Sequence, residues 1–295
     1  MLVIIIPYYK IHFFKATLDS LANQTDKRFK VYIGDDASPE NPSDLLERYK
    51  GQFDFVYHRF KTNLGSISLT QQWERCIGLS NEEWIQILGD DDCVSSNFVD
   101  SFYSNLNEIV YNKSSVVRFA TQIIDEKGNK VSNQYTHPKL ELNTDFINRK
   151  FSKLTRSSLS EYVFKSDVVK KYKFYDFPLA WHSDDLAVIQ FSDNQPIFSI
   201  NQALVYVRQS SYSITGSADN IKLKARATQQ FILNFIFSAQ YELSDKTIEL
   251  LQRKIEYAFI CDKSLEYYFK IAKYYLSKFK FYECMRLNYL IIRNK

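Results

Sequence analysis

The sequence predicts an α/β protein in which helices flank a mostly parallel sheet and a helical region follows at the C-terminus. Two observations predict this class. In residues 1–92, short apolar runs alternate with amphipathic segments in units of about 30 residues, the pattern of parallel strands joined by helical crossovers. Beyond residue 220, apolar residues instead recur at helical spacing. We therefore expect an α/β domain over residues 1–215 and a helical region over residues 216–295.

Short apolar runs give the expected strands. The runs are rich in β-branched or aromatic residues and end at a turn or a polar residue, which is typical of buried parallel strands. They cover residues 2–6, 30–33, 53–59, 85–88 and 115–124. Helices are expected between the first four, over residues 10–24, 45–50 and 67–79. The first helix carries Phe14, Leu18 and Leu21 at helical spacing, which gives it one apolar face.

The C-terminal region is predicted to be helical and basic. Its expected helices cover residues 225–237, 245–262, 264–277 and 279–293. Residues 221–295 hold 14 Lys and Arg against 7 Asp and Glu, whereas the rest of the chain has a net charge of −3. Basic helices with aromatic anchors can lie on an anionic membrane surface. They can equally pack as helical hairpins or form a homo-oligomer interface, which is the slightly favoured interpretation, and nucleic acid is not expected because the body of the protein is acidic.

The composition is that of an ordinary globular protein, with 45% hydrophobic and 24% charged residues. The four cysteines show no CxxC spacing and the four histidines are scattered, so we expect reduced thiols, a cytoplasmic setting and no zinc site. The N-terminus lacks the basic segment of a signal peptide. No stretch reaches the roughly 18 apolar residues needed to cross a bilayer. The expectation is a soluble protein or one peripheral to a membrane.

Acidic residues follow two of the expected strands at their carboxyl ends. Asp35 and Asp36 follow the second strand, and Asp90, Asp91 and Asp92 follow the strand over residues 85–88. In open α/β sheets, ligands bind at this edge. Three adjacent carboxylates repel one another, which favours protonation, splaying or a bound cation, and oxygen ligands suit Mg²⁺ or Mn²⁺ held partly by substrate phosphates. The alternatives are a solvated acidic turn and, for the first pair, a side chain that caps the following turn.

Two common nucleotide folds are not supported. No GxGxxG follows the first strand, and no GxxxxGK[ST] occurs in the chain. A diphosphate bound here would therefore need another source of positive charge. A metal ion on Asp90–Asp92 would supply it.

Four motifs in order resemble the family-two glycosyltransferases of the GT-A fold. They are Ile4-Ile-Ile-Pro7-Tyr8-Tyr9, Ser20-Leu-Ala-Asn-Gln24-Thr25, Val31-Tyr-Ile-Gly-Asp35-Asp36-Ala-Ser38 and Leu88-Gly-Asp90-Asp91-Asp92. The resemblance is strong over these first residues and continues more thinly to residue 215. Three positions depart from the family pattern: Lys10 replaces Asn, Ala37 replaces Gly, and Gly89 stands at the first acid of the DxD motif. Asp90-x-Asp92 still supplies that spacing.

The resemblance implies roles for the residues at these motifs. Asp36 would bind the edge of the donor's base, with Pro7 and Tyr9 against its ring, although Tyr9 as plain core packing is the alternative. Asp90 would contact the ribose. Asp91 and Asp92 would ligate the Mn²⁺ or Mg²⁺ ion that bridges two phosphates. Residues 206–215 resemble the family's loop over the diphosphate, where Arg208 would contact phosphate or simply solvate the loop.

A second acidic motif lies at Trp181-His182-Ser183-Asp184-Asp185-Leu186, where the family has its ED motif. The resemblance implies that Asp185 is the general base, which takes the proton from the acceptor hydroxyl. The alternative is that Asp184 and Asp185 cap the helix expected over residues 186–191. His182 is expected to be structural or to contact the acceptor.

The resulting hypothesis is an inverting, metal-dependent hexosyl or N-acetylhexosaminyl transferase. The resemblance implies a nucleoside-diphosphate donor, by family habit a UDP-sugar, and a saccharide or lipid-linked acceptor. It also implies work in surface polysaccharide synthesis (capsule or lipopolysaccharide O-antigen) at the inner face of the cytoplasmic membrane. Two alternatives stay open. A sugar nucleotidyltransferase normally needs a Gly-rich phosphate loop, which is absent, and a catalytically degenerate binding module is hinted at only by Gly89.

Overall fold

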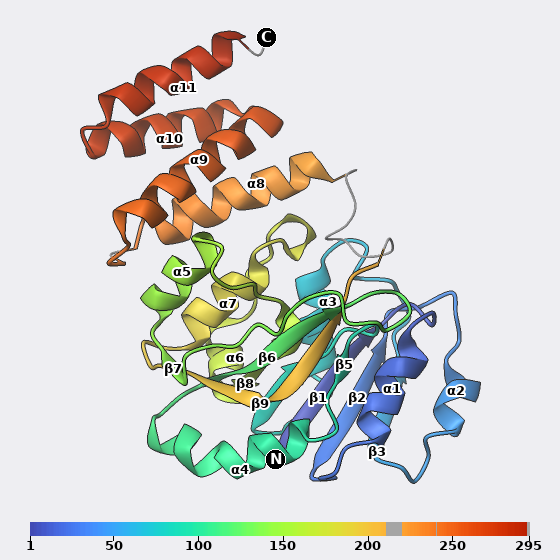
Figure 1. Cartoon of the computed structure of the whole chain (residues 1–295). Helices are drawn as coiled ribbons and strands as arrows, with labels where there is room; N and C mark the ends of the chain where they lie inside the picture. The colour runs from blue at the N-terminus through green and yellow to red at the C-terminus, as the bar shows by residue number, and fades with distance from the viewer. Residues whose placement is uncertain (211–219, 240, 294–295) are drawn as a thin grey trace.

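The computed structural model describes residues 1–210, 220–239 and 241–293 and shows a mixed sheet with helices on both faces (Figure 1). Within these residues the sheet has nine strands, in the order β3-β2-β1-β4-β8-β6-β9-β5, with β7 paired to β9. Their bounds are β1 (Leu2–Tyr8), β2 (Phe29–Asp35), β3 (Asp54–Arg59), β4 (Trp84–Ile87), β5 (Cys93–Val94), β6 (Val116–Ile124), β7 (Leu140–Glu141), β8 (Tyr162–Lys165) and β9 (Ile197–Arg208). The predicted fold class is confirmed.

The N-terminal half of the sheet is the parallel part. Strand β1 pairs in parallel with β2 and β4, and β2 pairs in parallel with β3. Strand β8 then runs antiparallel to β4 and β6, whereas β9 runs parallel to β6. Strands β5, β7 and β9 were not predicted, because β5 and β7 are two residues long and neither they nor β9 stand out by periodicity.

Strand β1 shows why the parallel strands read as continuous apolar runs. Its residues are packed on both faces of the sheet, with Val3 and Ile5 in one core and Leu2, Ile4 and Ile6 in the other. All five are fully buried. Because side chains of a strand alternate between faces, a strand covered on both sides needs apolar residues at every position.

The helices cover both faces of the sheet. The α-helices of the first 210 residues are α1 (Phe14–Ala22), α2 (Ser43–Glu47), α3 (Leu69–Ile77), α4 (Phe98–Tyr111), α5 (Asn143–Phe151), α6 (Ser166–Tyr172) and α7 (Ser183–Phe191). Short 3₁₀ turns η1 (Leu159–Glu161) and η2 (Pro178–Ala180) precede β8 and α7. Helices α1 and α4 contribute to one core, whereas α3, α5, α6 and α7 contribute to the other.

The C-terminal helices stack on the side of α5 and α7 (Figure 1). They are α8 (Ile221–Phe231), which continues as the π-turn η3 (Ile232–Ile236), then α9 (Asp245–Cys261), α10 (Leu265–Ser277) and α11 (Phe281–Arg293). Their apolar side chains do not form a core of their own. Phe231 of α8 and Phe259 of α9 belong to the same buried cluster as Phe151 of α5 and Phe177. The helices after residue 220 therefore share a core with the sheet.

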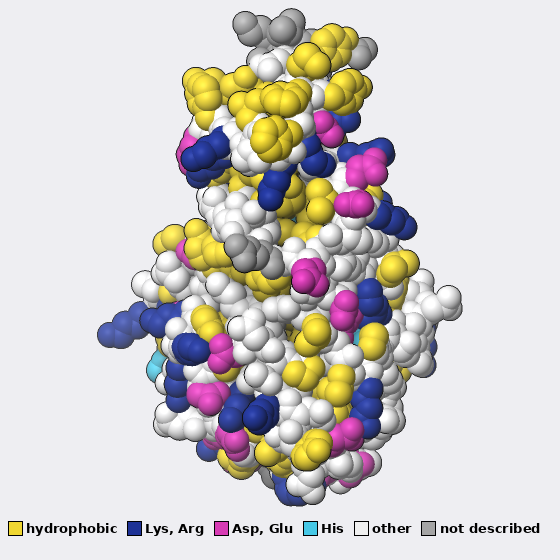
Figure 2. Space-filling view, turned by 90° about the vertical axis from the view of Figure 1, so that its left-hand side faces the viewer, with side chains coloured by type: hydrophobic (Ala, Val, Ile, Leu, Met, Phe, Trp, Pro, Cys, Tyr) yellow, Lys and Arg dark blue, Asp and Glu magenta, His cyan; other side chains and the backbone are white. Residues whose placement is uncertain are grey.

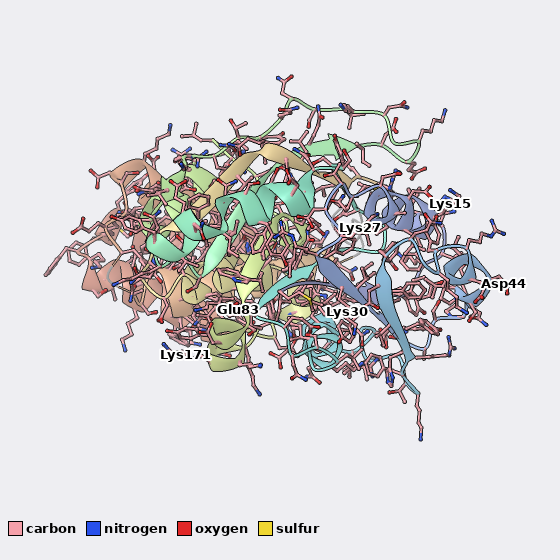
Figure 3. The ribbon with its side chains drawn as sticks, turned by 90° about the horizontal axis from the view of Figure 1, so that it is seen from below. Lys15, Lys27, Lys30, Asp44, Glu83 and Lys171 are labelled. Atoms are coloured by element: carbon pink, nitrogen blue, oxygen red, sulfur yellow. The ribbon has the colours of Figure 1, made fainter. Side chains whose placement is uncertain are left out.

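Charged residues mark the amino ends of the parallel strands. Seen from below, the charged residues labelled in Figure 3 include Lys27 and Lys30 at the start of β2 and Glu83 just before β4, which marks the amino ends of the strands. The carboxyl ends lie on the opposite side of the sheet.

None of the helices in the described residues has the length and apolar character that crossing a bilayer requires.

A fully buried arginine ties the two halves of the sheet region together. Arg118, in the middle of β6, donates from Nε to Glu161 of η1 at 2.8 Å and lies 3.6 Å from Glu141 of β7. It also donates to the carbonyl oxygen of Arg156. Both glutamates are buried. The segment over residues 155–161 contacts the Arg118 side chain through Arg156 and Glu161. The position of this segment therefore depends on one buried ion cluster.

We predict that Arg118→Met lowers the free energy of unfolding by about 3–5 kcal/mol, because it removes the closer of the two cations at the buried Glu161 and leaves Arg156 at 3.5 Å. Urea denaturation followed by circular dichroism measures the change. The control is Arg253→Met, which removes an exposed pair with Glu249 and should cost about 0.5 kcal/mol or less. Equal losses in the two variants would contradict the role given to Arg118.

Candidate functional site

A cavity opens at the carboxyl ends of β1, β2 and β4. Its volume is about 440 Å³, and it is lined by Pro7, Tyr9, Lys10, Asp36, Asn63, Gly65, Ser66, Leu69, Asp90 and Asp91. A smaller cavity of about 280 Å³ shares Lys10, Asp90 and Asp91 with it and is also lined by His12, Phe13 and Glu40. Five of the residues singled out in the sequence (Pro7, Tyr9, Asp36, Asp90 and Asp91) thus surround one space.

Asp90 joins the loop after β4 to the loop after β1. Its Oδ2 accepts hydrogen bonds from the backbone N–H groups of Tyr9 and Lys10, both at 2.8 Å. This contact holds the Tyr9 side chain, which is 37% exposed, at the wall of the cavity. An exposed aromatic face at this place is available for stacking.

Asp35 and Asp36 are adjacent in sequence but have different surroundings. The Asp35 carboxylate accepts from the Ser38 N–H at 2.7 Å, from the Tyr57 hydroxyl at 2.5 Å and from the Arg59 guanidinium at 2.7 Å. It is completely buried and makes the turn that was the alternative interpretation. Asp36, by contrast, lines the cavity.

The Asp36 carboxylate organises the loop across the cavity. It accepts from the backbone N–H groups of Leu64 at 2.7 Å and Gly65 at 2.8 Å, and it pairs with the Arg75 guanidinium. A Cβ on Gly65 would lie 2.5 Å from its Oδ2, so this close approach requires glycine. Nothing in the local sequence of Asn63-Leu-Gly65 signals that the Asp36 carboxylate binds it.

Asp92 is buried beside the cavity, where Ser160 and Arg208 hold it. Its Oδ2 accepts from the Ser160 hydroxyl at 2.5 Å and its Oδ1 accepts from the Arg208 N–H at 2.8 Å. The Ser160 hydroxyl oxygen also accepts from the Gly89 N–H at 3.1 Å. Neither Asp92 nor Asp185 is among the described residues that line the two cavities. Ser160 was not singled out in the sequence, where it lies in an unremarked serine-rich stretch.

The three carboxyl groups of this loop have raised pKa values. Burial raises the pKa of Asp90 and of Asp91 to about 6 and that of Asp92 to about 7. Repulsion between the neighbouring carboxylates acts in the same direction, while the hydrogen bonds to Asp90 and Asp92 oppose it. The loop therefore carries negative charge that the chain itself only partly compensates.

The donor set fits a divalent ion that is shared with a ligand. In the described part of the chain no cluster of three or more His, Cys, Asp and Glu residues is arranged as a metal site. Asp90 and Asp91 nevertheless line the same cavity. Mg²⁺ is commonly held by one or two carboxylates together with substrate phosphates and water, so two carboxylates at a cavity are sufficient for that kind of site.

Arg208 lies at the end of β9, 6% exposed, beneath the acidic loop. Its guanidinium donates to the carbonyl oxygens of Asp91 at 2.9 Å and Asp125 at 2.7 Å, and it lies over the Phe13 ring at 4.5 Å. Residues 211–215, the second half of the stretch predicted to cover a diphosphate, lie outside the described residues. In this structure the side chain braces the acidic loop from below.

Asp185 lies in the first turn of α7 and is 3% exposed. One carboxylate oxygen pairs with Lys150 of α5, and the other lies 2.8 Å from His182 Nδ1. Asp184 accepts at Oδ1 from the Asp185 N–H at 2.9 Å, and burial raises the pKa of its carboxyl group. The helix begins after His182, whose side chain does not cap it.

The family model for glycosyl transferase family 2 matches residues 3–165, which is more than half of the chain. The chain belongs to this family. The matched range contains Pro7, Tyr9, Asp36 and Asp90–Asp92 and ends before Asp185 and Arg208. The predicted family is thereby confirmed, and the membership favours a glycosyltransferase over a sugar nucleotidyltransferase.

Solved structures of S. aureus TarS resemble this family 2 member in fold. The TarS 1–349 complex with UDP-GlcNAc superposes with a TM-score of 0.64 at 14% identity, over 92% of this chain and 79% of that one. The complex of TarS 1–349 with UDP gives 0.58 at 15% identity, over 100% and 92%. The longer TarS structure gives 0.57 at 16% identity and is covered to 47%. No curated protein sequence matched. At these identities the likeness shows the fold, and the predicted GT-A fold is confirmed.

We predict that Asp91→Asn stabilises the protein at pH 8 and that about half of this gain is lost at pH 5. The pKa of Asp91 is raised to about 6, so above that pH the charged carboxylate lowers the free energy of unfolding. This loss of stability shrinks as the native carboxyl group takes up a proton. Allowing for partial solvent screening, we expect about 1–2 kcal/mol, or a few degrees in Tm.

Thermal unfolding of wild type and variant at the two pH values measures the effect. Asp54→Asn, which removes an exposed carboxylate 3.7 Å from Lys30, is the control and should change little at either pH. A gain that is the same at pH 8 and pH 5 would show that Asp91 is not held in a charge-crowded site.

Proposed function

We propose that this glycosyltransferase is an inverting enzyme that transfers a hexosyl or N-acetylhexosaminyl group from a UDP-sugar to a hydroxyl of a saccharide or lipid-linked acceptor. The observation that carries the proposal is the cavity where Pro7, Tyr9, Asp36, Asp90 and Asp91 meet. UDP and UDP-GlcNAc in the TarS complexes support a uridine donor. We assign the transfer reaction to residues 1–215. We further propose that the reaction serves the synthesis of a surface polysaccharide, either capsule or O-antigen.

The base end of the donor would lie between Tyr9 and Asp36. A uracil ring can stack on the exposed Tyr9 face beside Pro7, and its imide N–H can donate to the Asp36 carboxylate. Asp36 already accepts two backbone hydrogen bonds and pairs with Arg75, but among the described residues its Oδ2 accepts only from Gly65. Since a carboxylate oxygen can accept two hydrogen bonds, Oδ2 retains capacity for the base.

The phosphate end would lie over the acidic loop. Asp90 is proposed to bind the ribose, and Asp91 and Asp92 to hold Mn²⁺ or Mg²⁺. Each Asp92 oxygen accepts one hydrogen bond, from Ser160 or from Arg208, which leaves one lone pair on each. Arg208 would act by bracing this loop, with any phosphate contact as a second role. When bound, the ion would offset the charge on the diphosphate leaving group.

The chemical step is a direct displacement at the anomeric carbon. The acceptor oxygen forms a bond to that carbon on the face opposite the diphosphate, the bond to the diphosphate oxygen breaks, and the hydroxyl proton passes to a carboxylate. We assign that carboxylate to Asp185. Both of its oxygens accept a hydrogen bond in the structure, from Lys150 and from His182, and the second lone pairs remain for the proton.

Titration calorimetry with UDP tests the donor site. We expect wild type to bind UDP in the presence of Mn²⁺, and Asp91→Ala to lose at least about tenfold in affinity because the shared ion is no longer held. Asp54→Ala, on the exposed end of β3, is the matched control and should bind like wild type. Absence of binding to UDP, dTDP and GDP with and without metal would overturn the donor-site assignment.

We also propose that the protein works at the inner face of the cytoplasmic membrane, to which α10 and α11 would bind. Hydrophobic side chains gather over these helices with Lys and Arg side chains beside them (Figure 2). The exposed apolar residues are Leu265, Phe269, Leu276, Phe279, Phe281, Tyr282, Met285 and Tyr289. Residues 263–289 hold six Lys and Arg against two Glu. A second copy would face this surface with like charge, whereas anionic lipid complements it.

We predict that the protein sediments with vesicles of phosphatidylglycerol and phosphatidylethanolamine and not with phosphatidylcholine vesicles. The double variant Phe279→Ser, Phe281→Ser should lose most of this binding, and added salt should weaken it. Tyr111→Ser removes a side chain that is 84% exposed on α4 and serves as the control. A concentration-dependent dimer in light scattering without vesicle binding would instead identify the surface as an interface between copies.

A further inference from the structure

The backbone before α7 is held in an unfavourable conformation. Leu179, Ala180 and His182 have φ values of 60°, 53° and 74°, in the left-handed region that side chains other than glycine avoid. Each such residue costs about 1–3 kcal/mol, and it persists only where the surrounding contacts over-determine it. This segment leads directly into Asp185. The contacts that hold it are therefore contacts that place Asp185.

The His182 side chain makes the most extensive of these contacts. Its ring is 6% exposed and lies between two elements. On one side, Nδ1 lies 2.8 Å from Asp185 Oδ2. On the other, Nε2 lies 3.2 Å from the Thr228 hydroxyl of α8, and the ring stacks on Phe231 of α8 with 4.7 Å between centroids and 11° between planes. Since Thr228 and Phe231 are three residues apart, they lie on one face of α8.

The hydrogen-bond pattern defines what His182 does. Burial lowers the pKa of its imidazole well below the ordinary value, and Lys254 and Lys150 act in the same direction. A neutral ring has one N–H donor and one acceptor, so the nitrogen that faces the Asp185 carboxylate, Nδ1, must carry the hydrogen. Nε2 is then an acceptor, and the Thr228 hydroxyl shares its one hydrogen between Nε2 at 3.2 Å and the Lys224 carbonyl oxygen at 2.8 Å. The Asp185 carboxylate thus sets the ring tautomer, whereas α8 sets the position of the ring through Phe231 and Thr228.

Asp185 is fixed from its other side as well. Its second oxygen pairs with Lys150 of α5, and this lysine is largely buried. Phe151, next to Lys150, packs 6.0 Å from Phe231, so α5 and α8 also contact each other beside the carboxylate. Three elements, α5, α7 and α8, therefore meet around one side chain.

We propose that Thr228 and Phe231 act through His182 as positioning residues for Asp185, so that helix α8 is a working part of the transferase site. The inference rests on the proposed function, because Asp185 has its role as base only there. In this arrangement Asp185 touches the acceptor proton, His182 sets the direction of the carboxylate, and α8 sets His182. A displacement of about 1 Å in such a group can cost on the order of a hundredfold in rate.

The test uses full-length variants and the release of UDP from UDP-GlcNAc or UDP-glucose, whichever turns over. Thr228→Val removes the hydroxyl at nearly constant volume and should lower kcat about tenfold or more, with the donor KM and the UDP affinity unchanged. Thr228→Ser restores the hydroxyl and should restore kcat. Thr247→Val is the matched control: Thr247 is a buried threonine of α9 that bonds Ser244 and touches neither His182 nor Asp185.

His182→Asn provides a second measurement. Asparagine tolerates the left-handed backbone and can donate to Asp185 from the place of Nδ1, but it cannot reach Thr228. Its kcat should therefore stay above that of His182→Ala, and adding Thr228→Val to His182→Asn should have little further effect. If Thr228→Val does not fold, Phe231→Leu replaces it, with the same expected loss of kcat.

The outcomes separate this inference from the proposed function. Wild-type kcat in folded Thr228→Val and Phe231→Leu, together with loss of turnover in Asp185→Asn, would overturn the positioning role and leave Asp185 as base. Turnover retained in Asp185→Asn would overturn the assignment of the base and, with it, the positioning role. An equal loss of kcat in Thr247→Val and Thr228→Val would show a general effect on stability and would also overturn the inference.

Discussion

The candidate site depends on the contact between the Asp90 carboxylate and the backbone N–H groups of Tyr9 and Lys10. These groups come from the ends of two neighbouring parallel strands, and neither loop has a regular partner beyond the sheet. The Asp90 carboxylate accepts the hydrogen bonds that a further pair of strand residues would otherwise make. It brings the aromatic residue after β1 and the acids after β4 to one cavity, and it does so with a charged acceptor, which makes stronger hydrogen bonds than a neutral one.

Three carboxylates in a row, of which Asp92 is buried and Asp90 and Asp91 are half-buried, are tolerated because a second layer of groups supports them. Ser160 bonds both Asp92 and Gly89, and Arg208 supports the loop through its N–H and its guanidinium. Ser160 is itself placed by η1, where Glu161 pairs with the buried Arg118. The support is incomplete, because the pKa values of the three acids stay raised by burial. This loop has a fixed structure and carries negative charge that the protein only partly neutralises. It is therefore suited to bind a cation or a ligand that carries one.

Much of the fold could be read from the sequence, because buried parallel strands leave uninterrupted β-branched runs such as Leu2–Ile6. The residues around the cavity followed from their motifs and their place after strands. Contacts between residues that are far apart in the sequence could not be predicted from the local sequence. The motif pointed to Asp36, but the contacts that separate it from the chemically identical Asp35 come from Tyr57, Arg59 and Arg75. Arg208 contacts Asp91 over 117 residues, and no periodicity encodes that.

The buried cluster that runs from Phe151 and Phe177 into Phe231 and Phe259 constrains how such a chain can change over evolutionary time. A module joined through an exposed linker can be exchanged, lost or duplicated without disturbing its neighbour. Helices that supply 11 of the 33 buried residues of this cluster cannot, because their removal would expose the apolar side chains they cover. Substitutions on α8 must therefore be matched by substitutions on α5 and around η2. The sheet and the C-terminal helices are bound to vary as one unit.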